Sequence, residues 1–269
     1  MPELPEVETV CRMLANEVVG NSIRHINIVR RDLRWLVQAD FEDRCQGQVV
    51  ISVFRRGKYI ILELDHGHII WHLGMSGSIT VQASLGQKKH DHLTVFFSDG
   101  NCLVYNDPRR FGSVFWSDDW RCHPRIAVLG FEPLCKETTA VNLYKGLRGK
   151  SKAIKEAIMD ARLMVGVGNI YANEALFLSG VRPDVSAKSL SLTQVELLLA
   201  NIRLVLDKAI AKGGTTLNDY VNLDGKPGYF QQELNVYGRG GQLCNKCGSQ
   251  LEKMERFSRQ TVYCPSCQL

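Results

Sequence analysis

The sequence predicts an α+β protein in which an antiparallel β domain is followed by a helical domain and a small metal-stabilised hairpin. Three observations support this prediction. Short runs of alternating hydrophobicity occupy residues 22–116, helical periodicity occupies residues 140–209, and two pairs of closely spaced cysteines lie within residues 244–267. A chain of 269 residues is long enough for two domains and a small appended module.

One helix is expected before the first strand. Pro5 suits the first turn of a helix, acidic residues follow it, and apolar residues recur every three or four positions as far as Val18. Gly20 then stands where a helix usually ends. We therefore expect a helix over residues 5–19.

The next hundred residues favour β-strands. Turn-forming residues at 65–67 and 98–101 separate runs rich in Val, Ile and Phe, as in β-hairpins. Several short strands at this spacing are typical of an antiparallel sandwich or barrel. The expected strands are 22–29, 49–55, 59–64, 68–73, 92–97, 102–106 and 113–116.

Helical periodicity begins after a linker around residues 130–139. The longest helix opens with Ser191 followed three residues later by Gln194, a capping-box signature, and ends at Gly213. Residues 215–236 show little periodicity, and a loop of this length in a compact protein is usually functional or mobile. The other expected helices are 140–148, 152–160 and 169–179.

Composition and charge narrow the class of protein. The chain has no apolar run long enough for a membrane helix and no signal-peptide core, so we expect an intracellular protein. The formal net charge is +5, a mild excess whose clustering suits a polyanionic partner. The alternative for each cluster is a solvated surface. The clusters are Arg55–Lys58, Arg109–Arg110 and the group Lys145, Arg148, Lys150, Lys152 and Lys155.

The cysteine spacing predicts one structural zinc ion. Cys244 and Cys247 form one pair, and Cys264 and Cys267 form a second pair after sixteen intervening residues. Two such knuckles on a hairpin offer four thiolates in a tetrahedron, which leaves no open position for a catalytic water. The intervening hairpin is net cationic and suits a nucleic-acid groove, although RNA or a protein would also fit. The other five cysteines are expected to be reduced, mostly structural thiols.

The first residues carry a possible nucleophile. A small residue after the initiator Met allows Met1 to be removed, which would leave Pro2 with a free secondary amine beside the carboxyl group of Glu3. An α-amino group titrates at about 7.7 to 8, so a useful fraction is uncharged at cellular pH. Attack of such an amine on an aldehyde-level carbon gives an iminium, which permits elimination chemistry. The alternative is an ordinary polypeptide start before a helix.

Three turns carry side chains suited to nucleic acid. Arg109 and Phe111 follow one strand at a loop tip, where an Arg can bind a base edge and a Phe can separate a base step. Met75 lies in a glycine-flanked turn and suits the space left by an extruded base. Gly166–Asn169 opens a helix whose first amides can bind a phosphate. The alternatives are a hairpin anchor for Phe111, core packing for Met75 and a simple turn for Gly166–Asn169.

Together these segments closely resemble the bacterial formamidopyrimidine-DNA glycosylases over nearly the whole chain. The resemblance rests on motifs that are separated along the sequence, so it does not depend on any single one. They are Pro2–Thr9, Arg55–Tyr59, His72–Gly77, Lys89–His92, Asp107–Gly112, Val165–Ala172, Asp224–Phe230 and the terminal cysteine hairpin.

The resemblance implies a fold and a domain division. The expected parts are an N-terminal catalytic β-sandwich domain over residues 1–133, a helix-two-turn-helix DNA-binding domain over 134–225, and a module over 226–269 that contains the end of a lid and a four-cysteine zinc finger. Duplex DNA would lie between the two halves, and residues 215–236 would cover an extruded base. The protein is expected to be a monomer in the bacterial cytoplasm, associated with the nucleoid.

The resemblance also implies an activity and roles for single residues. The expected enzyme removes oxidised purines from duplex DNA and then cleaves the strand by β,δ-elimination, with Pro2 as the nucleophile and Glu3 as the acid and base. Lys58 would assist β-elimination and Arg259 δ-elimination. Met75, Arg109 and Phe111 would fill and wedge the duplex. The remaining expected DNA contacts are His90, Lys150 and Asn169, and the expected zinc ligands are Cys244, Cys247, Cys264 and Cys267.

Two alternatives stay open from the sequence. An endonuclease VIII-like enzyme would use the same nucleophile on oxidised pyrimidines, although that branch typically carries Gly where this chain has Leu4. A zinc-dependent DNA-binding protein without catalysis would result if Pro2 were blocked.

Overall fold

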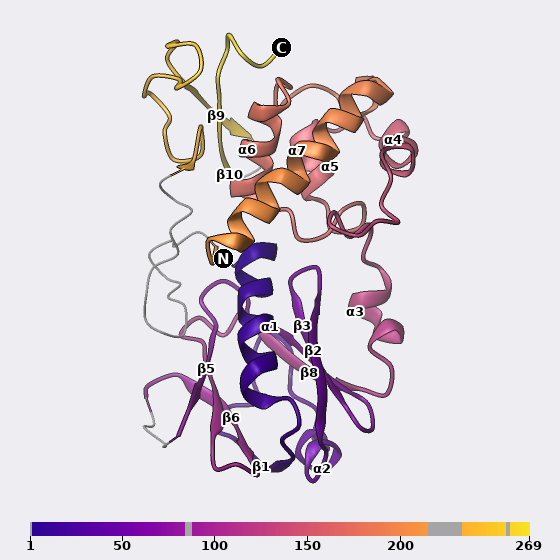
Figure 1. The fold of residues 1–269 in the computed structure, drawn as a ribbon, viewed down its shortest axis with the longest axis vertical. Helices are drawn as coiled ribbons and strands as arrows, with labels where there is room; N and C mark the ends of the chain where they lie inside the picture. Colours follow the sequence, from indigo (N-terminus) through magenta and orange to yellow (C-terminus); the bar gives the residue numbers. More distant parts are fainter. Residues whose placement is uncertain (1, 84–87, 215–232, 257–258) are drawn as a thin grey trace. The chain divides into compact units, whose positions relative to one another are not determined.

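The computed structural model describes residues 2–83, 88–214, 233–256 and 259–269. The chain divides into two compact units (Figure 1). Unit 1 comprises Met1–Ala127 with Gly213–Tyr229, and unit 2 comprises Val128–Lys212 with Phe230–Leu269. The three-domain division expected from the resemblance stays a prediction, because its second boundary, at residues 225 and 226, lies outside the described residues.

Unit 1 begins with helix α1, Leu4–Val18. Pro5 lies in its first turn as expected, and the chain leaves the helix through Gly20 in the left-handed region, with φ of +84°. The apolar positions that predicted the helix are buried, including Val7, Val10 and Leu14. The amphipathic pattern therefore places one face of α1 on the core.

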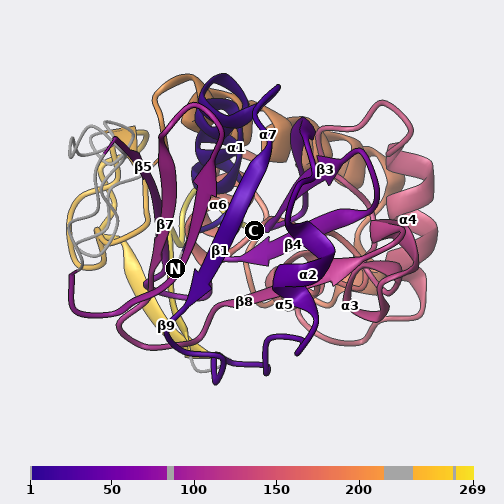
Figure 2. The ribbon, with the colours of Figure 1, turned by 90° about the horizontal axis from the view of Figure 1, so that it is seen from below.

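Eight strands of unit 1 form two antiparallel four-stranded sheets. The first sheet has the order β1-β6-β7-β5 and the second the order β2-β3-β4-β8. Figure 2 shows β1, β7 and β5 on one side and β3, β4 and β8 on the other. The strands are Ile23–Ile28 (β1), Val50–Arg56 (β2), Tyr59–Leu64 (β3), His68–His72 (β4), Ser78–Gln82 (β5), Asp91–Phe97 (β6), Cys102–Asn106 (β7) and Ser113–Ser117 (β8).

The core of unit 1 lies between the two sheets and α1. One cluster of buried side chains joins Val95 of the first sheet, Trp71 of the second and Leu14 of α1. Cys11 and Cys45 belong to this cluster, and burial raises the pKa of each thiol, with Glu8 and Glu42 adding to the effect. These two cysteines are therefore packing residues, as the sequence indicated. The two sheets and α1 confirm the predicted N-terminal β-sandwich with its helix.

One strand and two short α-helices of unit 1 were not predicted. Strand β5 carries only two apolar residues, Ile79 and Val81, and pairs with β7 at the edge of its sheet, so its sequence signal is weak. Helices α2, Phe41–Cys45, and α3, Pro124–Ala127, are five and four residues long. Helices this short do not complete the two turns that reveal helical periodicity.

Unit 2 contains the predicted helices. Ser191 and Gln194 form the predicted capping box, with the Gln194 N–H donating to Ser191 Oγ at 3.2 Å and the Ser191 N–H to Gln194 Oε1 at 2.9 Å. Gly168 is the N-cap of α6. The helices are Ala140–Arg148 (α4), Ile154–Met159 (α5), Asn169–Leu178 (α6) and Leu192–Ala211 (α7), with a turn of 3-10 helix at Ala187–Ser189.

The chain ends in a hairpin of strands β9, Glu252–Arg256, and β10, Arg259–Tyr263. A small buried cluster joins this hairpin to α6, with Val262 and Leu251 packing against Phe177. The fold class predicted for the helical region and the terminal hairpin is thus confirmed. Among the described residues, no helix combines the length and the apolar character needed to cross a membrane.

Candidate functional site

The start of α1 fixes Pro2 and Glu3. Pro2 is buried, and Glu3 is the N-cap residue of α1 with only 4% of its surface exposed. The Glu3 N–H donates to Glu6 Oε2 at 2.8 Å, and the two residues form a reciprocal capping box. Glu6 is itself buried and lies against the backbone of Gly214. Glu6 thus fixes Glu3, the residue directly after Pro2, a role that the sequence analysis missed.

Lys58 lies in the turn between β2 and β3, after Gly57 with φ of +59°. Its charge acts on His72, the β4 residue that pairs with Tyr59 across the sheet. Burial, with a smaller contribution from the charge of Lys58, lowers the pKa of His72 to about 4. His72 is therefore a neutral imidazole near neutral pH, and its Nδ1 accepts a 3.0 Å hydrogen bond from the Gly74 N–H.

Met75, Arg109 and Phe111 line one pocket of about 670 Å³. Met75 and Phe111 are 38% and 39% exposed, so neither is a core residue, and the Arg109 guanidinium lies 4.7 Å from the centre of the Phe111 ring. The structure therefore brings the three expected wedge residues together. The remaining lining residues are Asp32, Leu33, Arg34 and Arg110.

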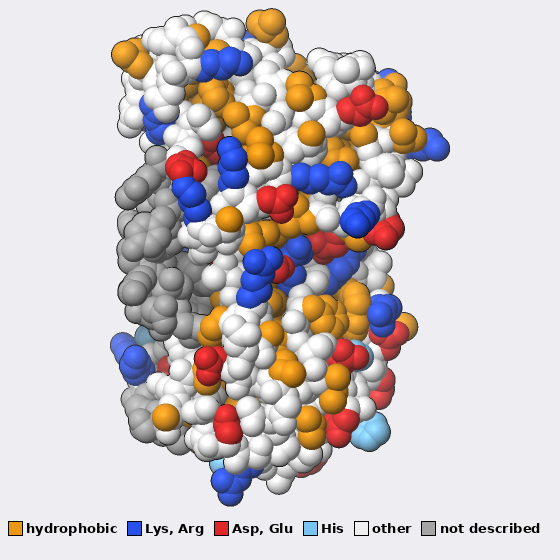
Figure 3. Space-filling view, in the orientation of Figure 1, with side chains coloured by type: hydrophobic (Ala, Val, Ile, Leu, Met, Phe, Trp, Pro, Cys, Tyr) orange, Lys and Arg blue, Asp and Glu red, His pale blue; other side chains and the backbone are white. Residues whose placement is uncertain are grey.

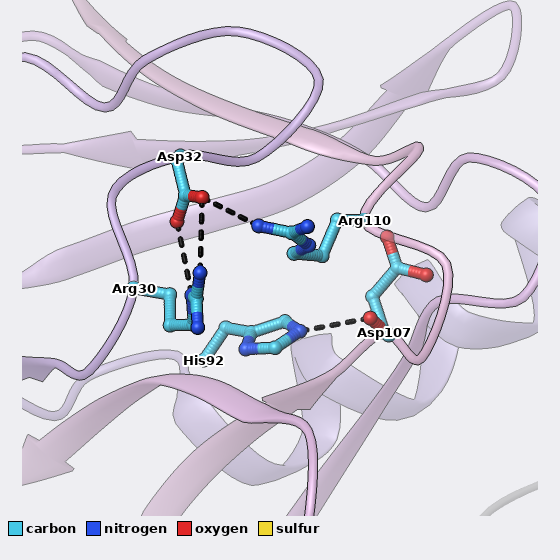
Figure 4. Close-up of polar contacts among 5 residues, drawn as sticks. All are labelled: Arg30, Asp32, His92, Asp107 and Arg110. Carbon is cyan, nitrogen blue, oxygen red and sulfur yellow. Dashed lines mark hydrogen bonds and ion pairs between the residues drawn. The ribbon is translucent and has the colours of Figure 1, made fainter.

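The loop after β1 supplies three of these other lining residues, Asp32, Leu33 and Arg34. The sequence analysis did not select them. Asp32 accepts two hydrogen bonds from Arg30, at 3.0 and 3.1 Å, and one from Arg110 Nη1 at 2.5 Å (Figure 4). The hydrogen bond from Arg30 lowers the pKa of Asp32 to about 2. The Arg34 N–H also donates to the Gly112 carbonyl at 3.1 Å, so this loop is tied to the turn over residues 107–112, the wedge turn.

His90 lies in the turn before β6 and has φ of +76°, a left-handed conformation that is rare for a residue with a side chain. Its carbonyl accepts a hydrogen bond from the Asp107 N–H at 3.1 Å. The His90 ring lies 6.2 Å from that of His92, which is buried. The turn of His90 is thus bonded to the strand end that leads to Arg109.

In unit 2, side chains of α5 and α6 hold the hairpin that carries Arg259. Lys155 is buried and its Nζ donates to Thr261 Oγ1 at 2.7 Å. Asn169 Nδ2 donates to the Gln260 carbonyl at 3.2 Å, and Asn173 Oδ1 accepts from the Val262 N–H at 3.1 Å. Arg259 is exposed next to these contacts. Asn169 and Arg259, two expected site residues, are therefore neighbours in the fold.

The sequence analysis also missed a structural role of Glu174, which lies on α6. Its buried carboxylate accepts the backbone N–H groups of Asn235, Val236 and Tyr237 at 2.8 to 2.9 Å. These residues closely follow the part of the expected lid, 215–232, that lies outside the described residues. Glu174 thus fixes the point at which the expected lid rejoins unit 2.

The basic clusters are mixed with acidic partners, and Lys and Arg side chains alternate with Asp and Glu on the face in Figure 3. Arg55 Nε pairs with Glu8 at 2.8 Å, and Lys152 Nζ pairs with Asp160 at 2.6 Å. Lys150 follows α4, and its N–H donates to the Leu147 carbonyl at 2.9 Å. The basic group at residues 145–155 is therefore not simply a solvated surface, because Lys152 and Lys155 make structural contacts.

The four predicted zinc ligands converge. The Sγ atoms of Cys244, Cys247, Cys264 and Cys267 lie within 4.8 Å of one another. A tetrahedral Zn²⁺ with Zn–S bonds of about 2.3 Å needs sulfur atoms about 3.8 Å apart, and the upper limit of 4.8 Å is compatible with this spacing. The Lys246 N–H points at Cys244 Sγ at 3.4 Å, the kind of donor that stabilises a bound thiolate. The residues fit one structural zinc ion.

Two family models match most of the chain. The formamidopyrimidine-DNA glycosylase N-terminal domain matches residues 1–114, and the formamidopyrimidine-DNA glycosylase H2TH domain matches residues 129–221. The formamidopyrimidine-DNA glycosylase of Serratia proteamaculans is 48% identical over 269 residues, and that of Saccharophagus degradans is 46% identical over 270 residues. Each alignment covers 100% of both chains.

Solved structures of similar proteins share the fold. A Lactococcus lactis Fpg mutant in complex with Fapy-dG-containing DNA is 34% identical with a TM-score of 0.91, covering 99% of each chain. The MutM (Fpg) protein of Thermus thermophilus is 36% identical with a TM-score of 0.89, covering 99% of this chain and 98% of that one. A MutM complex with DNA containing carbocyclic 8-oxo-G is 35% identical with a TM-score of 0.89, covering 99% of each chain.

Proposed function

The chain belongs to the formamidopyrimidine-DNA glycosylase family, and we propose that Pro2 is the nucleophile with which it acts on damaged DNA. The protein is a bifunctional glycosylase and abasic-site lyase that binds damaged duplex DNA and removes 8-oxoguanine and formamidopyrimidine lesions. The observation that carries the assignment to Pro2 is its burial beside Glu3 at the capped start of α1.

The reaction follows from a secondary amine at this position. The uncharged Pro2 nitrogen attacks C1′ of the damaged nucleotide, the glycosidic bond breaks, and the base leaves. Glu3 protonates the sugar and assists ring opening, which gives an iminium between Pro2 and C1′. The iminium acidifies the neighbouring carbon, so successive eliminations expel the 3′ and then the 5′ phosphate. Water hydrolyses the remaining adduct and frees Pro2, leaving a one-nucleotide gap.

Lys58 and Arg259 serve the two eliminations in this proposal. Lys58 lies in the β2–β3 turn of unit 1 and assists β-elimination, and Arg259 lies on the hairpin of unit 2 and assists δ-elimination. Support for Arg259 comes from the contacts of Lys155 and Asn169 with Thr261 and Gln260, which fix the strand that Arg259 begins. The bound zinc ion stabilises the same hairpin and takes no part in the chemistry.

The DNA contacts are assigned on the same basis. Met75 and Phe111 are exposed apolar side chains beside Arg109, a combination suited to filling and wedging a duplex from which one base has been extruded. Arg109 would face the orphaned partner base. His90, Lys150 and Asn169 would bind the phosphate backbone. These contacts would give an affinity that falls with rising salt concentration.

Borohydride trapping tests the assignment of the nucleophile. Reduction of the iminium links the protein covalently to DNA that contains 8-oxoguanine opposite cytosine. The Pro2→Gly variant should trap poorly, while Pro5→Ala, a matched change at a second proline of the same segment, should trap like the wild type. Mass spectrometry of the active protein should find Pro2 as its first residue. Undiminished strand scission by protein that retains Met1 would overturn the mechanism.

The proposal extends to the oligomeric state and the location of the protein. A monomer in the bacterial cytoplasm, associated with the nucleoid through DNA binding, suits an enzyme whose relatives were crystallised with lesion-containing DNA. Size-exclusion chromatography with light scattering should give the 30.3 kDa mass of one chain. A stable dimer would contradict this part of the proposal.

A further inference from the structure

Asp107 begins the turn that carries Arg109 and Phe111, and its carboxylate is completely buried. Four groups donate hydrogen bonds to it. Oδ1 accepts from Ser76 Oγ at 2.9 Å and from the Arg109 N–H at 3.3 Å. Oδ2 accepts from Tyr105 Oη at 3.0 Å and from the Gly112 N–H at 2.8 Å.

The backbone of Asp107 also bonds to two residues outside its own turn, His90 and His92. Its N–H donates to the His90 carbonyl at 3.1 Å. Its carbonyl lies 2.8 Å from His92 Nε2, which must be the donor because a carbonyl oxygen only accepts (Figure 4). Asp107 therefore contacts three turns that are distant in sequence: the Met75 turn through Ser76, the His90 turn, and its own turn.

These turns contain the two described non-glycine residues with positive φ, His90 at +76° and Arg110 at +55°. Both conformations are strained for residues with a Cβ atom and persist only where surrounding contacts hold them. The His90 carbonyl and the Arg110 N–H are each hydrogen-bonded to the Asp107 backbone, at 3.1 Å in both cases. Asp107 thus contributes to holding each of the strained residues.

The turns are also packed too tightly to rearrange independently. A Cβ atom added at Gly74 would lie 2.4 Å from the Phe111 carbonyl carbon and the Gly112 nitrogen. One added at Gly112 would lie 1.8 Å from Tyr105 Oη, the hydroxyl group bonded to Asp107. The Met75 turn and the wedge turn therefore meet backbone to backbone around the Tyr105–Asp107 hydrogen bond.

We propose that Asp107 is a positioning residue that sets Met75, His90, Arg109 and Phe111 in one arrangement before DNA binds. The inference rests on the proposed DNA contacts of those four residues. A group that fixes the wedge in advance removes the cost of ordering three turns when a base is extruded. Asp107 need not touch the DNA itself, since it acts through the turns that it joins.

The test is Asp107→Asn, which keeps the shape of the side chain but replaces one acceptor oxygen by a donor. The amide group cannot accept hydrogen bonds from both backbone N–H groups while its NH₂ faces one of them. We expect single-turnover excision of 8-oxoguanine opposite cytosine to slow by about 100-fold. Affinity for undamaged duplex should change little, because no basic side chain is lost.

A fluorescent base reports the position of the wedge directly. 2-Aminopurine placed next to the lesion brightens when the wedge unstacks it, and Asp107→Asn should lose most of this signal. Glu63→Gln is the matched control, because Glu63 also accepts a hydrogen bond from a serine, Ser52, at 2.6 Å but lies on β3. The control should keep both the signal and the rate.

Ser76→Ala keeps the inference testable if Asp107→Asn does not fold. It removes only the bond to the Met75 turn, so a smaller loss of the fluorescence signal is expected. A wild-type signal and rate in a folded Asp107→Asn variant would overturn the inference. If instead the wild-type protein itself shows no unstacking signal, the proposed wedge contacts fail, which is a different result.

Discussion

The backbone N–H of Glu3 donates a hydrogen bond of 2.8 Å to the carboxylate of Glu6, one turn further along α1. This bond fixes the chain directly after Pro2, the proposed nucleophile. The Glu6 carboxylate is also buried against Gly214, the last described residue before the expected lid. Glu6 is therefore expected to orient the N-terminus, although it takes no chemical step.

Glu6→Ala should slow excision of 8-oxoguanine by roughly tenfold or more, because the displaced terminus no longer meets C1′ in line. Loss of the cap should also lower the free energy of unfolding by about 1 kcal/mol. Glu6→Gln retains an acceptor oxygen and is expected to stay within about threefold of the wild type. Single-turnover kinetics and thermal unfolding check both. Equal losses in the two variants would show that the charge matters rather than the hydrogen bond.

Asp32 is the acidic residue that lines the pocket of Met75, Arg109 and Phe111, the wedge pocket, and it pairs with Arg30 and Arg110. Replacing it with Asn would release two guanidinium groups for phosphate binding. Asp32→Asn should therefore bind undamaged duplex more tightly, and its plot of log affinity against log salt should steepen by about 1 for each added phosphate contact. Fluorescence anisotropy across a salt series measures both quantities.

Asp40→Asn is the control for this prediction. Asp40 also pairs with an arginine, Arg44, at 3.0 Å and is as exposed as Asp32, at 53% against 55%. It is no lining residue of the wedge pocket. The same gain in affinity for both variants would mean that net charge alone is responsible.

Zinc removal should disable the hairpin of unit 2. Its strands have five residues each, and its buried cluster is too small to hold the knuckles without the metal. A strong chelator, or Cys247→Ser, is expected to abolish β,δ-elimination and to weaken DNA binding. Metal analysis should find one zinc per chain in the active protein. Full activity of a metal-free preparation would contradict the structural role.

The sequence predicted most elements because their hydrophobic patterns are long or strongly alternating. Strand β5 was missed because an edge strand with two apolar residues resembles a loop. Hydrogen-bond partners were harder to predict. Glu174 lies in α6, whose residues from Ile170 to Phe177 are all buried, so a partner was required. Nothing in the sequence identified that partner as the backbone of residues 235–237.

The same limit applies to the proposed site. Arg109, Phe111 and Met75 were selected from residue type and turn context, or from the resemblance. The loop of Asp32 and Arg34 was not selected, because its place in the pocket depends on contacts with Arg110 and Gly112, far along the chain. Asp107 was visible as part of a motif, but the hydrogen bonds by which it joins three turns depend on tertiary structure.

His72 is expected to make stability depend on pH. Burial lowers its pKa from 6.5 to about 4, so the folded protein holds it neutral, whereas the unfolded chain protonates it below 6.5. Below pH 6.5 the unfolded chain therefore binds more protons than the folded protein, and the free energy of unfolding decreases. The contribution is complete above pH 6.5 and is lost as the pH falls towards 4, by about 1.4 kcal/mol for each tenfold difference in proton affinity.

The variant His72→Asn keeps an acceptor for the Gly74 N–H but cannot titrate in this range. Its midpoint of urea unfolding should therefore change less between about pH 7 and about pH 4.5 than that of the wild type. His66→Asn, in the exposed turn between β3 and β4, is the matched control and should follow the wild-type curve. Parallel curves for the wild type and His72→Asn would show that His72 is not the group responsible, because its proton affinity would then be equal in the folded and unfolded states.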